Sequence, residues 1–209
     1  IGFGAGSFLA KSSPGKPVVV GRDMRPHSPG LVRELQRGLL ASGVKVIDVG
    51  LVDTPFLYWA VNALDGAGAI QTTASHNPIQ YNGFKISGPG AAPIGRESGL
   101  QEIEVLATSC AYQAGDESPA VDHQDLWSGY REHVHRFLPA ALLDGTVRLK
   151  VAVDASNGMA GTMVPKVFAS VPGLELIQLH FDNDQGSFVH EPNPLVESNL
   201  RSGSYTHLT

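Results

Sequence analysis

The strongest constraint on the fold is a regular alternation of short apolar runs and helical patterns over the first 72 residues. Apolar runs at 16–21, 44–50 and 67–72 are closed by glycine or polar residues, which is typical of buried strands. The two segments between them carry apolar residues at helical spacing. A strand–helix–strand–helix–strand order predicts a parallel sheet with right-handed crossovers.

The ends of the helices are marked by capping residues. Ser28 and Thr54 each stand directly before a proline. Serine and threonine cap helix N-termini and proline suits the first helical position, so we expect both residues to be N-caps. Gly43 is expected to end the first of these helices. Asp122 or Asp125 is expected to cap a later helix.

A short run at 83–87 (GFKIS) follows the third strand after a polar loop. The loop is too short for a crossover helix, so this run is predicted to pair antiparallel to the third strand. A helix is predicted from Arg96 to Cys110. Residues 1–115 are therefore expected to form an α/β domain with a mixed, mainly parallel sheet and helices on both faces.

The rhythm restarts after a polar stretch at 113–121, which is the predicted linker. Helices and strands are predicted in the order helix, strand, helix, strand at 125–138, 147–154, 161–170 and 174–179. Two strands are too few for a stable sheet. Residues 119–200 are therefore expected to be an incomplete second α/β domain of similar type, followed by a tail at 201–209 without periodicity, and the chain is expected to be part of a longer protein.

Composition excludes several classes of function. The formal charge is −5 and no basic run occurs, which argues against a nucleic-acid partner. The chain has one cysteine, Cys110, so an intramolecular disulfide is impossible and a cysteine-based zinc site is implausible. No apolar run approaches the roughly 18 residues of a membrane span, so no membrane association is expected. These features together suit a cytoplasmic protein.

The segment richest in chemistry is Thr73-Ala-Ser-His-Asn-Pro78 followed by Tyr81-Asn-Gly-Phe-Lys85. Ser75 comes just after the carboxyl end of a parallel strand, where open α/β sheets bind ligands. His76 beside it can act as an acid, a base or a charge partner. Lys85 returns toward Ser75 if the 83–87 run pairs with the third strand. A cation beside a serine suits phosphate chemistry.

These two segments resemble the phosphoserine loop of the α-D-phosphohexomutases, the phosphoglucomutase/phosphomannomutase superfamily. Four further segments resemble family motifs in the same order along the chain. They are GRDMRPHS (21–28), VGLVDTPFLYWA (49–60), VDASNGMAG (153–161) and GSFVHEPNPLVESNL (186–200). The resemblance spans almost the whole chain and implies the family's α/β fold.

The resemblance implies an intramolecular phosphoryl shift on hexose phosphates. Ser75 would be the phosphoserine, with a hexose 1,6-bisphosphate as intermediate and activator. Mg²⁺ would be bound through the phosphate on Ser75. Lys85 matches a family lysine that acts as general acid or base. His76 is expected to orient the loop and balance the phosphate charge.

Three further residues are candidates for phosphate binding. Asn77 can also hold the loop through bonds from its side chain to the backbone. Arg22 and Arg25 either face the phosphate or pair with Asp23, and the sequence leaves both possibilities open. Hexose phosphates are the expected partners of the protein, which would be a monomer or a dimer.

Parts of the family pattern have no counterpart in the 209 residues. The aspartate-rich magnesium loop and the sugar- and phosphate-binding third and fourth domains are missing, so these residues alone are expected to be inactive. Asp154, Asp182 and Asp184 are interpreted as structural. A non-catalytic phosphosugar-binding or scaffold domain is the main alternative, and a serine hydrolase using Ser75 and His76 is a weaker one.

Two other patterns are interpreted as structural. The glycines at positions 2, 4 and 6 mimic part of a dinucleotide-binding fingerprint, but no strand precedes them, which favours close helix packing. His133 and His135 lie two residues apart on a predicted helix. They would face different sides of it and make a poor metal pair.

Overall fold

The computed structural model describes residues 1–110, 120–184 and 186–190, which form two compact units. The first unit comprises residues 1–73 and 82–126, and the second comprises residues 74–81 and the chain from residue 127. The predicted linker at 113–121 lies largely outside the described residues, and so do the tail at 201–209 and most of the motif at 186–200. The domain limits at 115 and 119 therefore stay predictions.

The first unit is built on a five-stranded sheet with the strand order β4-β3-β1-β2-β5. The strands are β1 (Val18–Arg22), β2 (Val46–Leu51), β3 (Gly68–Thr72), β4 (Phe84–Ser87) and β5 (Asp122–His123). β1, β2, β3 and β5 are parallel, and β4 pairs antiparallel with β3. The predicted α/β class with a mixed, mainly parallel sheet is confirmed.

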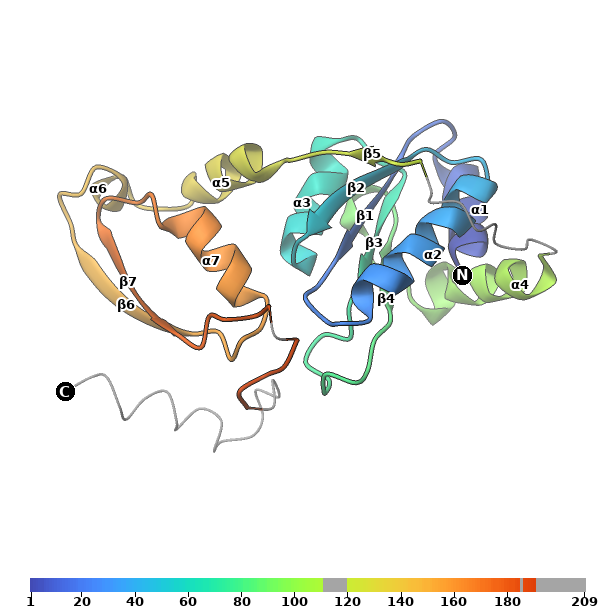
Figure 1. Cartoon of the computed structure of the whole chain (residues 1–209). Coiled ribbons are helices and arrows are strands. Elements are labelled where there is room, and N and C mark those ends of the chain that lie inside the picture. The colour runs from blue at the N-terminus through green and yellow to red at the C-terminus, as the bar shows by residue number, and fades with distance from the viewer. Residues whose placement is uncertain (111–119, 185, 191–209) are drawn as a thin grey trace. The chain divides into compact units, whose positions relative to one another are not determined.

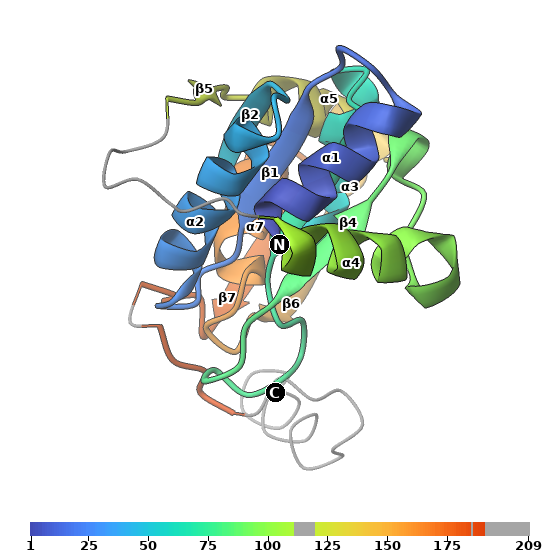
Figure 2. The same cartoon turned by 90° about the vertical axis from the view of Figure 1, so that its right-hand side faces the viewer.

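Helices cover both faces of this sheet (Figure 1). They are α1 (Gly2–Ser12), α2 (Ser28–Ala41), α3 (Thr54–Ala63) and α4 (Gln101–Ser109). α3 packs on one face, while α1, α2 and α4 lie on the other, with α1 in contact with both α2 and α4 (Figure 2). Short turns at Pro89–Ala91 (η1, 3₁₀) and Arg96–Leu100 (η2, π-helical) connect β4 to α4, so the helix predicted from Arg96 begins only at Gln101.

The central strands are completely buried because helices cover both of their faces. Val18, Val19 and Val20 of β1 have no exposed surface, and neither have Ala69 and Ile70 of β3. Burial of each of these valine and isoleucine side chains stabilises the fold by roughly 1.5–3 kcal/mol. β3, the strand that leads into the Ser75 loop, is thus buried along its whole length.

The glycines of α1 allow close contact with its neighbouring helices. A Cβ on Gly4 would lie 2.5 Å from the Ile103 carbonyl oxygen of α4, and one on Gly38 of α2 would lie 2.7 Å from the Phe3 nitrogen. A Cβ on Gly2 would overlap the Leu35 carbonyl oxygen. Backbone atoms cannot move aside as a flexible side chain can. The expectation of close helix packing is therefore confirmed.

Two of the predicted caps are wrong. The N-cap of α2 is His27, and Ser28 is the first helical residue. Asp53, not Thr54, caps α3, because its Oδ1 accepts a hydrogen bond of 2.9 Å from the Phe56 amide. Asp122 lies in β5, so of the two residues predicted to cap the later helix Asp125 remains. At α3 the Asp53 carboxylate stands one residue before the Thr54 hydroxyl and is the stronger acceptor, so Asp53 takes the capping position.

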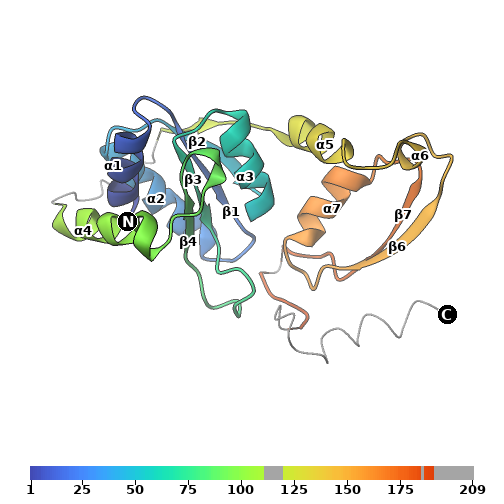
Figure 3. The ribbon, with the colours of Figure 1, turned by 180° about the vertical axis from the view of Figure 1, so that it is seen from behind.

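The second unit contains a two-stranded parallel sheet. Its elements are α5 (Trp127–His135), α6 (Ala140–Leu143), β6 (Leu149–Asp154), α7 (Ala160–Phe168) and β7 (Leu174–Leu179). α7 lies against one face of the sheet (Figure 3) and buries Met163 and Val167. Leu149 and Val151 of β6 remain 48% and 38% exposed. Within the described parts of the chain, no helix is long and apolar enough to cross a bilayer.

Candidate functional site

The site is the loop that follows β3. β3 ends at Thr72, and Ser75 comes three residues later, beyond the carboxyl end of a parallel strand. Ser75 is exposed and adopts a left-handed backbone conformation, with φ of 57°. A serine rarely occupies this region, which costs about 1–2 kcal/mol for a residue with a Cβ. Such strain persists where the surrounding structure enforces it, and it is frequent at functional sites.

The loop brings Ser75 and His76 together. The Ser75 Oγ lies 3.3 Å from the His76 Nδ1, and both side chains are exposed. The imidazole nitrogen accepts from or donates to the hydroxyl according to its protonation. The pair therefore places an ionisable group directly beside the serine oxygen, as the sequence predicts.

Asn77 shapes the loop through its own turn. Its Nδ2 donates to the Ala74 carbonyl oxygen at 2.9 Å, and its backbone amide donates to the same oxygen at 3.1 Å. The Tyr81 amide closes a second turn on the Pro78 carbonyl oxygen at 3.1 Å. The expected side-chain bond to the backbone is therefore present, whereas phosphate binding by Asn77 stays a prediction.

Asp23 anchors the start of the loop, a role that our sequence interpretation misses. Its Oδ2 accepts a 2.7 Å hydrogen bond from the Thr73 hydroxyl, and its Oδ1 accepts a 2.6 Å bond from the Ser28 hydroxyl. Asp23 is 5% exposed. The signal in the sequence is a carboxylate directly after a buried strand, in a segment that matches a family motif.

The two arginines beside Asp23 differ in their surroundings. The Arg25 side chain is completely buried, and its Nε donates to the Asp23 Oδ2 at 3.1 Å. Of the two possibilities for Arg25, pairing with Asp23 is thus present in the structure. Arg22 is half-buried, and its Nη1 lies 3.4 Å from the Asp23 carbonyl oxygen. Phosphate binding by either arginine stays a prediction.

Lys85 lies on β4 at the end nearest the loop. It is exposed, and its register partner on β3 is Gln71. The neighbouring pair, Phe84 with Thr72, is the last of the ladder before the loop. The predicted antiparallel return is therefore confirmed. Lys85 belongs to the first unit and Ser75 to the second, so their approach to one another stays a prediction.

The described residues do not form a magnesium site by themselves. No group of three histidine, cysteine, aspartate or glutamate side chains within them could hold a metal ion. Asp154 instead accepts from the Ser156 amide at 2.8 Å. The neighbouring Asp184 raises the pKa of Asp182 through a side-chain hydrogen bond and through charge repulsion between the two carboxyl groups.

The two histidines of α5 have separate surroundings. The His135 Nε2 lies 2.7 Å from the Val167 carbonyl oxygen, whereas the His133 ring packs edge-on against Phe137. Their interpretation as a poor metal pair stays a prediction.

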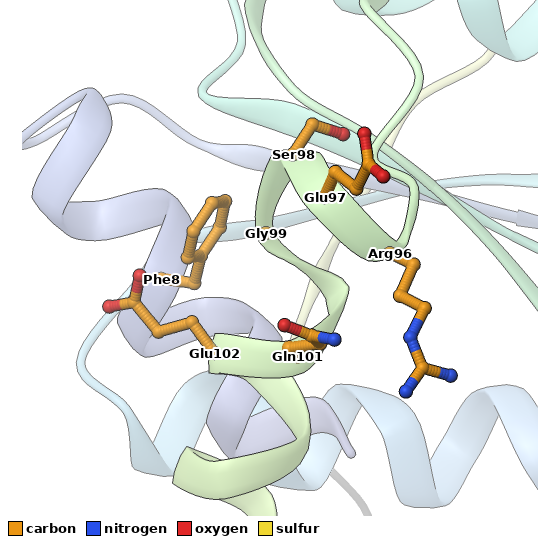
Figure 4. A pocket seen from close by; sticks show the side chains of 7 residues that line it. All are labelled: Phe8, Arg96, Glu97, Ser98, Gly99, Gln101 and Glu102. Carbon is orange, nitrogen blue, oxygen red and sulfur yellow. The ribbon is translucent and has the colours of Figure 1, made fainter.

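A shallow pocket of about 370 Å³ opens beside α1 and the π-helical turn (Figure 4). It is lined by Phe8, Arg96, Glu97, Ser98, Gly99, Gln101 and Glu102. None of these is a predicted site residue. Gly99 has a φ of 141°, and a Cβ there would collide with the Phe8 ring, so this pocket reflects how the turn packs against α1.

Comparison with known proteins identifies the family. A model described as phosphoglucomutase/phosphomannomutase, alpha/beta/alpha domain I, matches residues 1–113. The chain belongs to the phosphoglucomutase/phosphomannomutase family. It is 36% identical to a protein of Xanthomonas campestris named "Phosphohexose mutases", over 93% of this chain and 42% of the relative. It is 34% identical to a phosphomannomutase of Vibrio cholerae, over 94% of this chain and 43% of the relative.

The likeness to solved structures of this family extends through both units. A crystal structure of a phosphoglucomutase/phosphomannomutase family protein from Burkholderia thailandensis superposes with a TM-score of 0.79 and 34% identity. That match covers 97% of this chain and 43% of the other. The chain thus spans about two fifths of the length of the relatives that it matches.

Proposed function

We propose that Ser75 is the phosphoryl carrier of a phosphohexomutase that interconverts hexose 1-phosphates and 6-phosphates. The observation that carries the proposal is the position of Ser75: exposed, left-handed and beyond β3, in a chain of the phosphoglucomutase/phosphomannomutase family. The names of the relatives, phosphomannomutase and phosphohexose mutase, supply the substrate class.

The proposed reaction has two transfers. In the first, a sugar hydroxyl oxygen attacks phosphorus on phosphorylated Ser75, and the bond between phosphorus and the Ser75 Oγ breaks. The product is a hexose 1,6-bisphosphate. In the second, the serine oxygen attacks the other phosphoryl group of the bisphosphate, which restores phosphoserine and releases the isomeric monophosphate. A serine ester thus divides one rearrangement into two in-line displacements.

Protons must move in both transfers. The attacking sugar hydroxyl loses a proton, and the sugar oxygen released in the second transfer gains one. We assign this exchange to Lys85, which lies at the loop end of β4. His76, 3.3 Å from the serine oxygen, would orient Ser75 and offset phosphate charge when protonated.

Phosphorylated Ser75 would supply only part of a magnesium site. A phosphate on Ser75 would offer one oxygen ligand, and Mg²⁺ requires about six, usually with a carboxylate among them. The described residues supply no such set. We further propose that residues 1–209 alone carry out no mutase turnover.

We also propose a cellular location and an oligomeric state for the protein. A reducing, cytoplasmic location suits a chain with a single cysteine and hexose phosphates as substrates. The negative net charge of −5 argues against a nucleic-acid partner. A monomer or a dimer is proposed.

Phosphorylation of Ser75 is the direct test. The longer protein expected to contain these residues is incubated with glucose 1,6-bisphosphate or mannose 1,6-bisphosphate, and intact mass and peptide mapping follow the label. We expect one phosphate on Ser75, absent in Ser75→Ala and retained in Ser109→Ala, which removes an exposed helical hydroxyl. Label that persists in Ser75→Ala contradicts the assignment. Reaction of Ser75 with a fluorophosphonate, without phosphorylation, favours a hydrolase instead.

In the same longer protein, Lys85→Ala should slow the transfer to Ser75 by roughly 10²–10⁴-fold, the usual range for general acid–base catalysis. The readout is the rate of label uptake at saturating bisphosphate. A near-normal rate removes Lys85 from the proton exchange.

A further inference from the structure

Asp23 sits in a short turn between β1 and α2, buried beneath the start of the Ser75 loop. Its carboxylate accepts four hydrogen bonds. Oδ1 accepts from the Arg25 amide at 3.1 Å and the Ser28 hydroxyl at 2.6 Å. Oδ2 accepts from the Arg25 Nε at 3.1 Å and the Thr73 hydroxyl at 2.7 Å. An ionised carboxyl has about four acceptor positions, so these donors use the full capacity of Asp23.

Further hydrogen bonds connect Ser28 to the residues at the other end of the loop. Ser28 accepts from the Asn82 Nδ2 at 2.9 Å while donating to Asp23. The Asn82 Oδ1 accepts from the Gly83 amide at 2.9 Å, and the Gly83 carbonyl accepts from the Thr73 amide at 2.9 Å. The five residues form a closed ring of hydrogen bonds, called here the Asp23 ring.

The ring joins the two ends of the loop that carries Ser75. Thr73 is the last residue before segment 74–81, and Asn82 is the first after it. Asp23 and Ser28 lie at the end of β1 and the start of α2 and have 5% and 0% exposure. The loop ends are therefore fixed to the buried core through side chains that do not belong to the loop.

Asp23 is suited to positioning and not to binding a ligand. Its acceptors are occupied, its charge faces the buried Arg25 guanidinium, and its side chain is 6% exposed. It is linked to the loop through Thr73, which lies two residues before Ser75 in the chain. A displacement of about 1 Å at a reacting group is enough to cost about 10²-fold in rate.

We propose that Asp23 is a positioning residue for phosphoryl transfer, which fixes the place of the Ser75 oxygen by holding Thr73 and, through Ser28, Asn82. This inference rests on the proposed function of Ser75. It assigns to the buried turn at 23–28 a role in transfer rate, in addition to its part in stability.

The test uses Thr73→Val, which keeps the shape of the side chain and removes its hydroxyl, so that Asp23 stays paired with Arg25. Thr73→Ser restores the hydroxyl, and Ser28→Ala opens the ring on the other side. Ser87→Ala is the matched control, because it removes another buried hydroxyl from the same sheet, bonded to the Ala69 carbonyl oxygen.

Two measurements are made on the longer protein expected to contain these residues. The first is the rate at which a hexose 1,6-bisphosphate phosphorylates Ser75, as a function of bisphosphate concentration. The second is hydrogen–deuterium exchange of the amides of Asn77 and Tyr81, which are hydrogen-bonded within the loop.

For Thr73→Val we expect a saturating rate lowered by roughly 10–100-fold, an unchanged half-saturating concentration and faster exchange in the loop. Thr73→Ser should recover most of the rate, and Ser87→Ala should match the wild type. Ser28→Ala combined with Thr73→Val should lose less than the sum of the single losses in log rate, because both open one ring.

The outcomes separate this inference from the proposed function. If the wild type takes up no label on Ser75, the proposed function falls and this inference falls with it. If the wild type is labelled normally and Thr73→Val is labelled at the same rate, the inference alone is overturned. Equal loss in Thr73→Val and Thr73→Ser also overturns it, because the hydroxyl is then not what matters.

Discussion

The two sheets start from the same strand–helix–strand pattern and differ in how they are covered. β1 and β3 are parallel neighbours, and Val18, Val19 and Val20 are completely buried between α3 on one face and the α1, α2 and α4 layer on the other. β6 and β7 are also parallel neighbours, yet Val151 is 38% exposed because α7 covers one face.

This difference shows where the molecule can hold a strained, exposed loop. Elements with many buried apolar contacts open rarely, whereas exposed strands open at lower cost. The Ser75 loop follows β3, a strand that is buried along its whole length. The strained serine conformation is thus attached to the part of the chain that is best able to enforce it.

The largest contrast is expected between two ion pairs. Asp23→Ala leaves the buried Arg25 charge without its carboxylate and should cost about 3–5 kcal/mol. Glu175→Ala on β7 removes the partner of Lys150 on β6. Both side chains are more than 60% exposed, so the loss should cost about 0–1 kcal/mol. Urea unfolding of both variants measures the free energies. Similar losses of stability in the two variants would mean that covering both faces of a sheet with helices does not make its ion pairs more important for stability.

The same valine deletion should have unequal effects in the two sheets. Val20→Ala removes two buried methyl groups from β1 and should cost about 2 kcal/mol, including the cavity it leaves. Val151→Ala removes methyl groups that are already partly in water and should cost less than about 1 kcal/mol. Hydrogen exchange of each sheet reports the local change. A larger loss at Val151 would contradict the comparison.

The smallest contrast concerns pH. Burial raises the pKa of Asp53, so its charged form is disfavoured in the folded state and stability falls as pH rises above about 4. Hydrogen bonds from Thr146 lower the pKa of Asp144, so its contribution is present above about pH 4 and is lost as pH falls.

Replacement by asparagine should reveal these opposite signs. As pH rises from 3 to 7, the free energy of unfolding of Asp53→Asn should increase relative to that of the wild type. Over the same range, the free energy of unfolding of Asp144→Asn should decrease relative to that of the wild type. Thermal melts across this range provide the measurement. Parallel pH profiles for the two variants would contradict the assigned causes.

The sequence predicts those parts of the fold that depend on apolar pattern. β1, β2 and β3 are long apolar runs, and their strands lie within two residues of the predicted ranges. β5 is missed because Asp122 and His123 have no apolar pattern, and backbone pairing with β2 alone makes them a strand. Capping is mispredicted at Thr54 because a neighbouring aspartate competes for the same amide.

Within the candidate site too, residues that belong to a local motif are predicted from the sequence and contacts between distant residues are not. The exposed pair of Ser75 and His76 is adjacent in sequence, so a motif is enough to find it. The support from Asp23 depends on a contact between residues 50 positions apart, Asp23 and Thr73. Such a contact arises only when β1 and β3 become neighbours in the sheet, and no local pattern records it.

The glycines of α1 have a consequence for the order of folding. Each glycine within a helix costs about 1 kcal/mol relative to alanine, and an isolated helix of 11 residues is already marginal in water. α1 therefore has little tendency to form by itself. We expect α1 to become helical when it packs closely against the backbones of α2 and α4. The first helix of the chain should therefore be among the last to become ordered.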